Sequence, residues 1–178
     1  TKFEKEKYIL QSEYRKKGKN SSLIADFAFL RDYKSLTGNK IKTKNVNHLF
    51  LDYTSDLKIP NYLESRFDAQ FEKVTNDTYL KVFQNNLFDT PVMPGSQTTM
   101  NSNLKLYLEK ENQNLTTGVV VYENLGTRHS DRYQYTLPYY DFSKNLTSLI
   151  EDNSINGSLN FYSTGTNKLS NTNNLRTT

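Results

Sequence analysis

The two histidines are the residues of this chain that most readily do chemistry, because histidine serves as acid, base or metal ligand near neutral pH. His48 lies beside Leu49 and Phe50 in a predicted strand, which favours a structural or an exposed histidine over a catalytic base. His129 lies in the segment 128–132, which also contains Ser and Asp, the other side chains of a hydrolase triad. Adjacent residues do not direct their side chains into a relay, because triads are assembled from separate segments. We therefore predict a polar turn at 128–132 and no catalytic residue there.

The remaining site chemistries find little support in the sequence. Cysteine is absent, so thiol nucleophiles and cysteine–zinc sites are excluded. Glu64, Asp68 and Glu72 share one face of a predicted helix, but Arg66 and Lys73 lie nearby and indicate a solvated surface. The seven glycines form no phosphate-binding pattern. We expect no metal, no cofactor and no enzymatic activity.

Basic residues are concentrated in the first 19 positions, which hold seven Lys and Arg against three Glu, a difference equal to the net charge of +4. Because the two signs alternate there, we favour a solvated helical arm. The alternative is a contact with nucleic acid or with lipid headgroups. The residues for such a contact are Arg15, Lys16, Lys17 and Lys19.

A cluster of tyrosines near the end of the chain is the most suggestive feature for binding. Tyr133 and Tyr135 alternate, so they share one face of a predicted strand, and Tyr139 and Tyr140 follow closely. Tyrosine is enriched at interfaces because it joins a rigid apolar ring to a polar hydroxyl. The cluster is read as core, as a protein-binding face or as a stacking platform for sugars or single strands. We predict that these four tyrosines bind a partner.

The elements that must position these residues change character along the chain. Apolar residues at helical spacing predict four helices in the first half of the chain. The first spans 3–17, the second begins at a cap at Ser21 or Ser22 and ends at Gly38, and the last two span 60–74 and 76–87. A strand is predicted at 40–53. After a loop at 89–96 the apolar period becomes two. Further elements follow it, namely strands near 104–108, 119–122 and 133–137, a short helix or turn at 142–150 and a strand at 158–162.

This order predicts an α+β fold, with N-terminal helices packed on a curved antiparallel meander. At the level of element order alone it resembles the cone-shaped arrangement of the nuclear-transport-factor type. We divide the chain into a basic N-terminal helical arm (1–19), a single α+β domain (20–162) and a flexible polar tail (163–178).

The function that follows is a soluble, non-enzymatic protein-interaction or assembly module. Its partner is another protein or a second copy, and a membrane is reached only through a segment outside this chain. The lack of cysteine favours an extracytoplasmic or cell-surface domain of a membrane-anchored or secreted bacterial protein, in secretion, conjugation, pilus assembly or immunity. The alternative is a cytoplasmic or nuclear accessory protein that contacts nucleic acid through residues 1–19.

Overall fold

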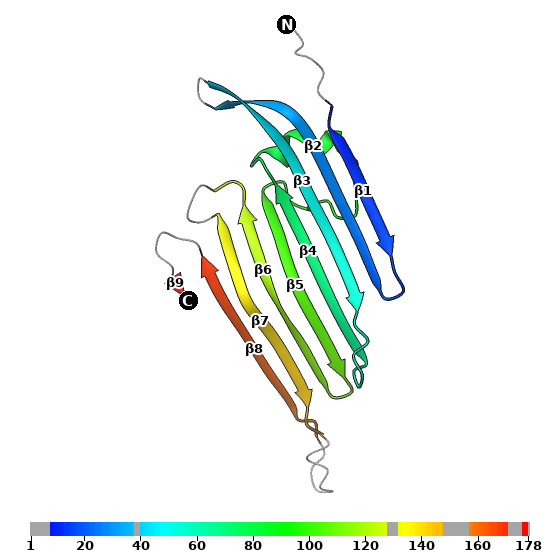
Figure 1. The fold of residues 1–178 in the computed structure, drawn as a ribbon. Helices are drawn as coiled ribbons and strands as arrows, with labels where there is room; N and C mark the ends of the chain where they lie inside the picture. The colour runs from blue at the N-terminus through cyan, green and yellow to red at the C-terminus, as the bar shows by residue number, and fades with distance from the viewer. Residues whose placement is uncertain (1–7, 38–39, 128–131, 148–156, 171–175, 178) are drawn as a thin grey trace.

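A single antiparallel β-sheet dominates the computed structural model, which describes residues 8–37, 40–127, 132–147, 157–170 and 176–177. Its nine strands follow one another across the sheet in the order of the sequence (Figure 1). The strands are β1 (Leu10–Lys17), β2 (Ser21–Thr37), β3 (Lys40–Asp56), β4 (Glu64–Val74), β5 (Thr99–Lys110), β6 (Gln113–Asn124), β7 (Tyr133–Asn145), β8 (Asn160–Ser170) and β9 (Arg176–Thr177).

Strict alternation of side chains explains why the central segments are strands. In β4 the residues Glu64, Arg66, Asp68, Gln70 and Glu72 point to one face, and the intervening Phe67, Ala69 and Phe71 point to the other. Short connections then fix the antiparallel order. Only two residues separate the last pair of β5 and β6, in which Lys110 lies opposite Gln113.

The two helical turns lie together in the connection between β4 and β5. They are α1 (Tyr79–Phe83) and the 3-10 helix η1 (Gln84–Asn86). We call the side of the sheet that they cover the helix face, and it carries His48 and Phe50 of β3. The core forms where this connection meets one end of the sheet, which we call the upper end because it lies uppermost in Figure 1. The buried residues of the core are Leu30, Val46, Phe50, Val74, Tyr79, Leu80, Val92, Met100 and Leu125.

A buried polar cluster fastens the connection to the sheet. Asp26 of β2 accepts hydrogen bonds from the hydroxyl of Thr90 (2.8 Å) and from the amide of Gln11 (2.9 Å). His48 places Nδ1 3.1 Å from the hydroxyl of Tyr79, and its Nε2 lies 3.2 Å from Oδ1 of Asp26, outside hydrogen-bond geometry. Because Asp26 and His48 are completely buried, every one of these contacts forms without competition from water.

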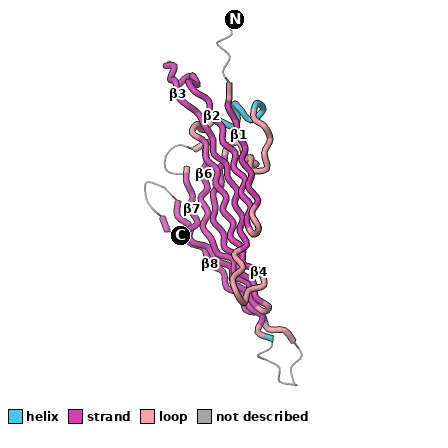
Figure 2. Tube along the Cα trace, turned by 45° about the vertical axis from the view of Figure 1, so that its right-hand side comes forward, coloured by secondary structure: helices cyan, strands magenta, loops and turns pink. Residues whose placement is uncertain are grey.

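Away from its upper end the sheet is a single layer. No residue between Asn101 and Tyr122, which covers nearly all of β5 and β6, is buried. The same is true of the described side chains of β7 and β8. When the molecule is turned by 45°, the strands still lie in one layer, and the connection with the helical turns lies against its upper end (Figure 2). The side chains of the lower sheet therefore have solvent on both faces unless something other than the described residues covers them.

The predicted α+β fold is wrong, because the segments 3–17, 21–38 and 60–74, predicted to be helices, contain the strands β1, β2 and β4 and no described helical residue. The reason is a degeneracy in spacing: four residues are close to one helical turn and are also two strand periods. Leu63, Phe67 and Phe71 fit both. Of the helices predicted before the loop at 89–96, only 76–87 contains helical residues, those of α1 and η1. The helix or turn predicted at 142–150 begins inside a strand, because β7 continues to Asn145.

Two further expectations change with the fold class. The cone-shaped nuclear-transport-factor arrangement is overturned, because the described residues form no helix that packs along the length of the sheet. The last predicted strand, 158–162, is part of β8, which continues to Ser170. Residues 163–170, assigned to a flexible tail, are thus in a strand that pairs with β7. The antiparallel meander predicted for the second half of the chain is present as β5, β6 and β7.

Candidate interaction surface

The side of the sheet opposite the helix face, which we call the bare face, is apolar across most of the strands. Residues that lie directly opposite each other in the ladder point to the same side, so the register assigns each side chain to a face. The large apolar side chains that are exposed or half-buried on the bare face are Leu10, Tyr14, Leu23, Phe27, Phe29, Leu49, Leu51, Tyr53, Phe67, Phe71, Leu104, Leu106, Leu108, Leu115, Val119, Val121, Tyr133, Tyr135, Tyr140, Phe142, Phe161 and Leu169.

These side chains form continuous rows rather than isolated spots. One row runs from Tyr53 through Ala69 and Leu104 to Val119, each residue lying opposite the next on the neighbouring strand. Strands lie about 4.8 Å apart, so the apolar rows from β2 to β8 extend roughly 30 Å across the sheet. Exposed apolar surface of this extent marks interaction sites in folded proteins.

The exposure of the central side chains shows that nothing in the described chain covers them. Phe27 is 45% exposed, Phe71 42% and Leu104 47%, although all three lie on strands with neighbours on both sides. Their remaining contacts come from the side chains beside them on the same face. Covering them would therefore remove a large apolar area from water, at a gain of about 25 cal/mol for each Å².

Charged groups on the bare face lie at its two ends. At the upper end Glu123 accepts hydrogen bonds from Lys73 (2.7 Å), Tyr133 (2.8 Å) and Arg132 (2.7 Å). Burial alone would raise the pKa of Glu123, but these three donors hold it below its usual range. At the lower end the bare face carries the lysine Lys16 on β1. Between these ends the described side chains of the bare face are uncharged, and most of them are apolar.

The helix face below the core has the opposite character. On β4 it carries Arg66, which contacts Glu64 at 3.0 Å and Asp68 at 3.1 Å. Burial, with the nearby charge of Asp68, raises the pKa of Asp52 on the next strand. The sheet thus separates a charged, hydrogen-bonding side from an apolar side, as expected of a surface that meets water on one side only.

The predicted tyrosine cluster divides between the two faces. Tyr133 and Tyr135 stack on the bare face with ring centres 6.1 Å apart. The register of β7 shifts between Thr136 and Tyr139, opposite a shift in β6. This irregularity turns Tyr139 to the helix face, whereas an unbroken strand would keep it beside Tyr135. No pattern of apolar residues could have revealed the shift.

Two of these tyrosines also contact glycines of the neighbouring strands. A Cβ atom on Gly165 would lie 2.2 Å from the ring of Tyr140, and one on Gly118 would lie 2.9 Å from the hydroxyl of Tyr139. The rings therefore occupy the space that side chains at these glycines would fill. Tyr140 remains 41% exposed, so its outer edge is still open to a partner on the bare face.

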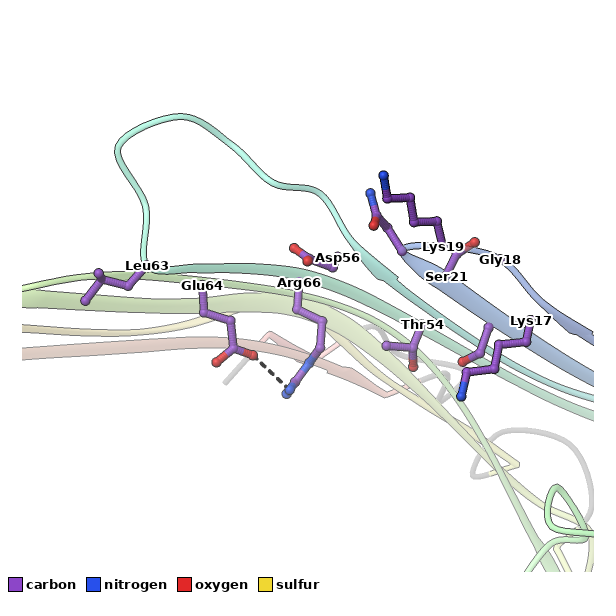
Figure 3. A pocket seen from close by; sticks show the side chains of 11 residues that line it. Lys17, Gly18, Lys19, Ser21, Thr54, Asp56, Leu63, Glu64 and Arg66 are labelled. Atoms are coloured by element: carbon purple, nitrogen blue, oxygen red, sulfur yellow. Dashed lines mark hydrogen bonds and ion pairs between the residues drawn. The ribbon is translucent and has the colours of Figure 1, made fainter.

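The basic residues predicted for nucleic acid or headgroups do not form one patch. Arg15 pairs with Glu13 on the helix face, and Lys16 lies on the bare face. Lys17 and Lys19 line an open pocket of about 490 Å³ at the lower end of the sheet. Figure 3 shows that their side chains point away from each other, with Lys17 on the side of Arg66 and Glu64. Convergent anion binding by these four residues is not supported by this arrangement.

The histidines offer no reactive site in the described part of the chain. His48 is completely buried, so a substrate cannot reach it. His129 lies outside the described residues. The described residues contain no group of three or more side chains that could hold a metal ion. Sequence reasoning missed Asp26 and Glu123, because each gains its partners only when distant strands and the upper connection meet.

Comparison with known proteins adds no identification: the chain matches no protein family, no curated protein and no solved structure. Within the described residues, no helix has the length and apolar character needed to cross a bilayer.

Proposed function

We propose that this chain is a non-enzymatic interaction or assembly module that acts by placing its bare face against an apolar surface supplied from outside the chain. The observation that carries the proposal is the row of exposed apolar side chains on strands with neighbours on both sides, Phe27, Phe71 and Leu104 among them. A partner protein with a complementary apolar face is the first candidate. Tyr133, Tyr135 and Tyr140 belong to this surface, and Tyr139 does not.

The test compares charges introduced on the two faces of the same two strands. Phe71→Lys with Leu104→Lys places two charges on the bare face. The matched control is Gln70→Lys with Asn103→Lys, which alters the adjacent positions on the helix face, where these residues lie opposite each other. We expect the wild-type chain to bind nonionic detergent, the first variant to lose most of that bound mass, and the control to keep it. A wild-type chain that stays monomeric without detergent and binds none would refute the proposal.

A second candidate for the covering surface is lipid hydrocarbon. The distribution of charge favours it, because Lys73, Glu123 and Arg132 gather at the upper end of the bare face and Lys16 lies at the lower end. An apolar band bordered by charges suits contact with hydrocarbon between two polar layers. Flotation with neutral phosphatidylcholine vesicles tests it. If the wild-type chain floats with the vesicles and the Phe71→Lys, Leu104→Lys variant sediments, lipid is the covering surface. If the wild-type chain does not float, lipid is excluded and a partner protein remains the candidate.

The compartment and the alternative function stay predictions. We retain an extracytoplasmic setting as part of the proposal, since the chain lacks cysteine. Contact with nucleic acid through residues 1–19 is tested by salt-titrated binding to DNA and RNA. Affinity that falls steeply with salt and is lost on deletion of residues 1–19 would favour that alternative.

A further inference from the structure

Most of the outer edge of β8 is not paired with any other described strand. On one side β8 pairs with β7 from Asn160 to Ser170. On the other side, within the described residues, it pairs only with β9, through Leu169 opposite Thr177 and Ser170 opposite Arg176. Residues 160–168 therefore present a row of backbone N–H and C=O groups at the margin of the sheet (Figure 1). The chemical complement of such a row is another extended backbone.

The two edges of the sheet differ in their protection. At the opposite margin β1 carries Glu13, Arg15, Lys16 and Lys17 within eight residues, which is a common way to discourage strand addition. Over residues 160–168 of β8 the single charged side chain is Lys168, and proline is absent. The side chains at Thr164 and Thr166 are exposed and uncharged. Apart from Lys168, this stretch of the β8 edge thus lacks the charged side chains and the proline that discourage the addition of another strand.

We propose that this edge binds the same edge of a second copy of the chain, so that two β8 strands pair antiparallel across a two-fold axis at Thr164. The inference goes beyond the proposed function and does not depend on it, since it concerns the margin of the sheet rather than its bare face. The centre follows from the boundaries, because Thr164 is the midpoint of the stretch between Asn160 and Lys168, above which β9 occupies the edge. Pairing is antiparallel because a two-fold axis normal to the sheet reverses the strand.

The cross-strand pairs of this arrangement are compatible with one another. Thr164 lies opposite Thr164 of the second copy, a pair that is favourable in antiparallel sheets. Tyr162 lies opposite Thr166, and Lys168 lies opposite Asn160, so like charges do not meet. The axis also keeps the bare faces of both copies on the same side. The dimer would therefore double the width of the apolar surface without interrupting it.

Disulfide cross-linking tests the pairing. Because the chain has no natural cysteine, any disulfide must form between the introduced residues. In Thr164→Cys the two thiols would face each other across the axis, within the reach of a disulfide. Thr166→Cys on the same strand and Ser12→Cys on β1 are matched controls, because neither position meets its own copy. The measurements are made in nonionic detergent, which covers the bare face and removes association through it. Circular dichroism confirms that each variant keeps the β-sheet.

We expect T164C to form the covalent dimer at least tenfold faster than T166C or S12C. Sedimentation of the wild-type chain in the same detergent should give a dimer whose dissociation is weakened by T164K, which sets two like charges opposite each other, by roughly threefold or more in affinity. A monomeric wild type, or T164C that cross-links no faster than the controls, overturns the proposal. Fastest cross-linking by T166C also overturns it, because the register would then be wrong.

Discussion

Removal of the Asp26 carboxylate should strongly destabilise the fold. The carboxylate is completely buried and accepts hydrogen bonds from Gln11 and Thr90, and it lies 3.2 Å from His48. These partners come from β1, β3 and the connection that carries α1. In Asp26→Ala, Gln11 and Thr90 lose their common acceptor and His48 loses the carboxylate beside its Nε2, so the effect reaches every element that meets at this end of the sheet.

The magnitude follows from the groups left behind. A buried polar group that loses its partner costs about 1–3 kcal/mol. The lower part of that range applies to Gln11, which still bonds the backbone of Phe88, and to His48, which still contacts Tyr79. The costs for Gln11, His48 and Thr90 together come to about 4 kcal/mol. This agrees with the roughly 3–5 kcal/mol lost when one partner of a buried pair is removed. Asp26→Asn keeps one acceptor oxygen and should cost about half as much.

Urea unfolding followed by circular dichroism measures the loss. The matched control is Asp52→Ala, a carboxylate on the same face that is exposed and only partly shielded from water by its neighbours. Its free energy of unfolding should stay within about 0.5 kcal/mol of wild type, because it gives up no buried contact. A cost below about 1 kcal/mol for Asp26→Ala, or an equal cost for the two variants, would refute the reasoning.

The pH dependence gives an independent check on the same carboxylate. Burial opposes its charge, but the contacts with His48, Thr90 and Gln11 prevail and hold the pKa of Asp26 below its ordinary value of 3.8. A depressed pKa contributes stability that is present above the unfolded pKa and is lost as the pH falls through the folded pKa. The difference between wild type and Asp26→Ala should therefore be constant near neutral pH and shrink below about pH 4. A difference that grows on acidification would contradict this assignment.

Three further perturbations test other contacts. Burial, with the charge of Asp26, raises the pKa of Tyr79 to about 12, so wild-type stability should fall from pH 10 to 12 more steeply than that of Tyr79→Phe, measured by urea unfolding. Glu123→Ala should lower the free energy of unfolding by about 1–2 kcal/mol, because Lys73 and Arg132 lose their shared acceptor but both reach water and Arg132 still pairs with Asp77; thermal melts at neutral pH would show it. Gly165→Ala should cost about 1–3 kcal/mol through the ring of Tyr140, and adding Tyr140→Ala should remove most of that extra cost in a double-mutant cycle.

The local sequence pattern predicted the structure correctly where apolar and polar residues alternate regularly and short turns connect the strands. The antiparallel meander of β5, β6 and β7 follows from the alternation of Leu104, Leu106 and Leu108 and from the turns that flank it. The polar turn expected at 128–132 lies largely outside the described residues, and His48 proved to be buried. The lack of a metal or catalytic motif stays a prediction.

The prediction of helices in the first half of the chain was wrong for a physical reason that β2 illustrates. Its apolar residues point to both faces, Phe27 and Phe29 to the bare face and Ala28 and Leu30 to the helix face. A strand that is apolar on both faces loses its period of two, and spacings of four then fit a helix equally well. β4 carried a clearer signal, since Glu64, Arg66, Asp68, Gln70 and Glu72 alternate with smaller or apolar side chains.

By itself the sequence determined the chemical inventory: no thiol, two histidines, abundant tyrosine and a basic beginning. Only the tertiary structure decided where these groups act, because the register of neighbouring strands assigns each side chain to a face. A register shift in β7 separated Tyr139 from Tyr135, and the packing of one connection buried Asp26 with His48. Such long-range pairings depend on which strands meet, and local spacing does not encode that choice.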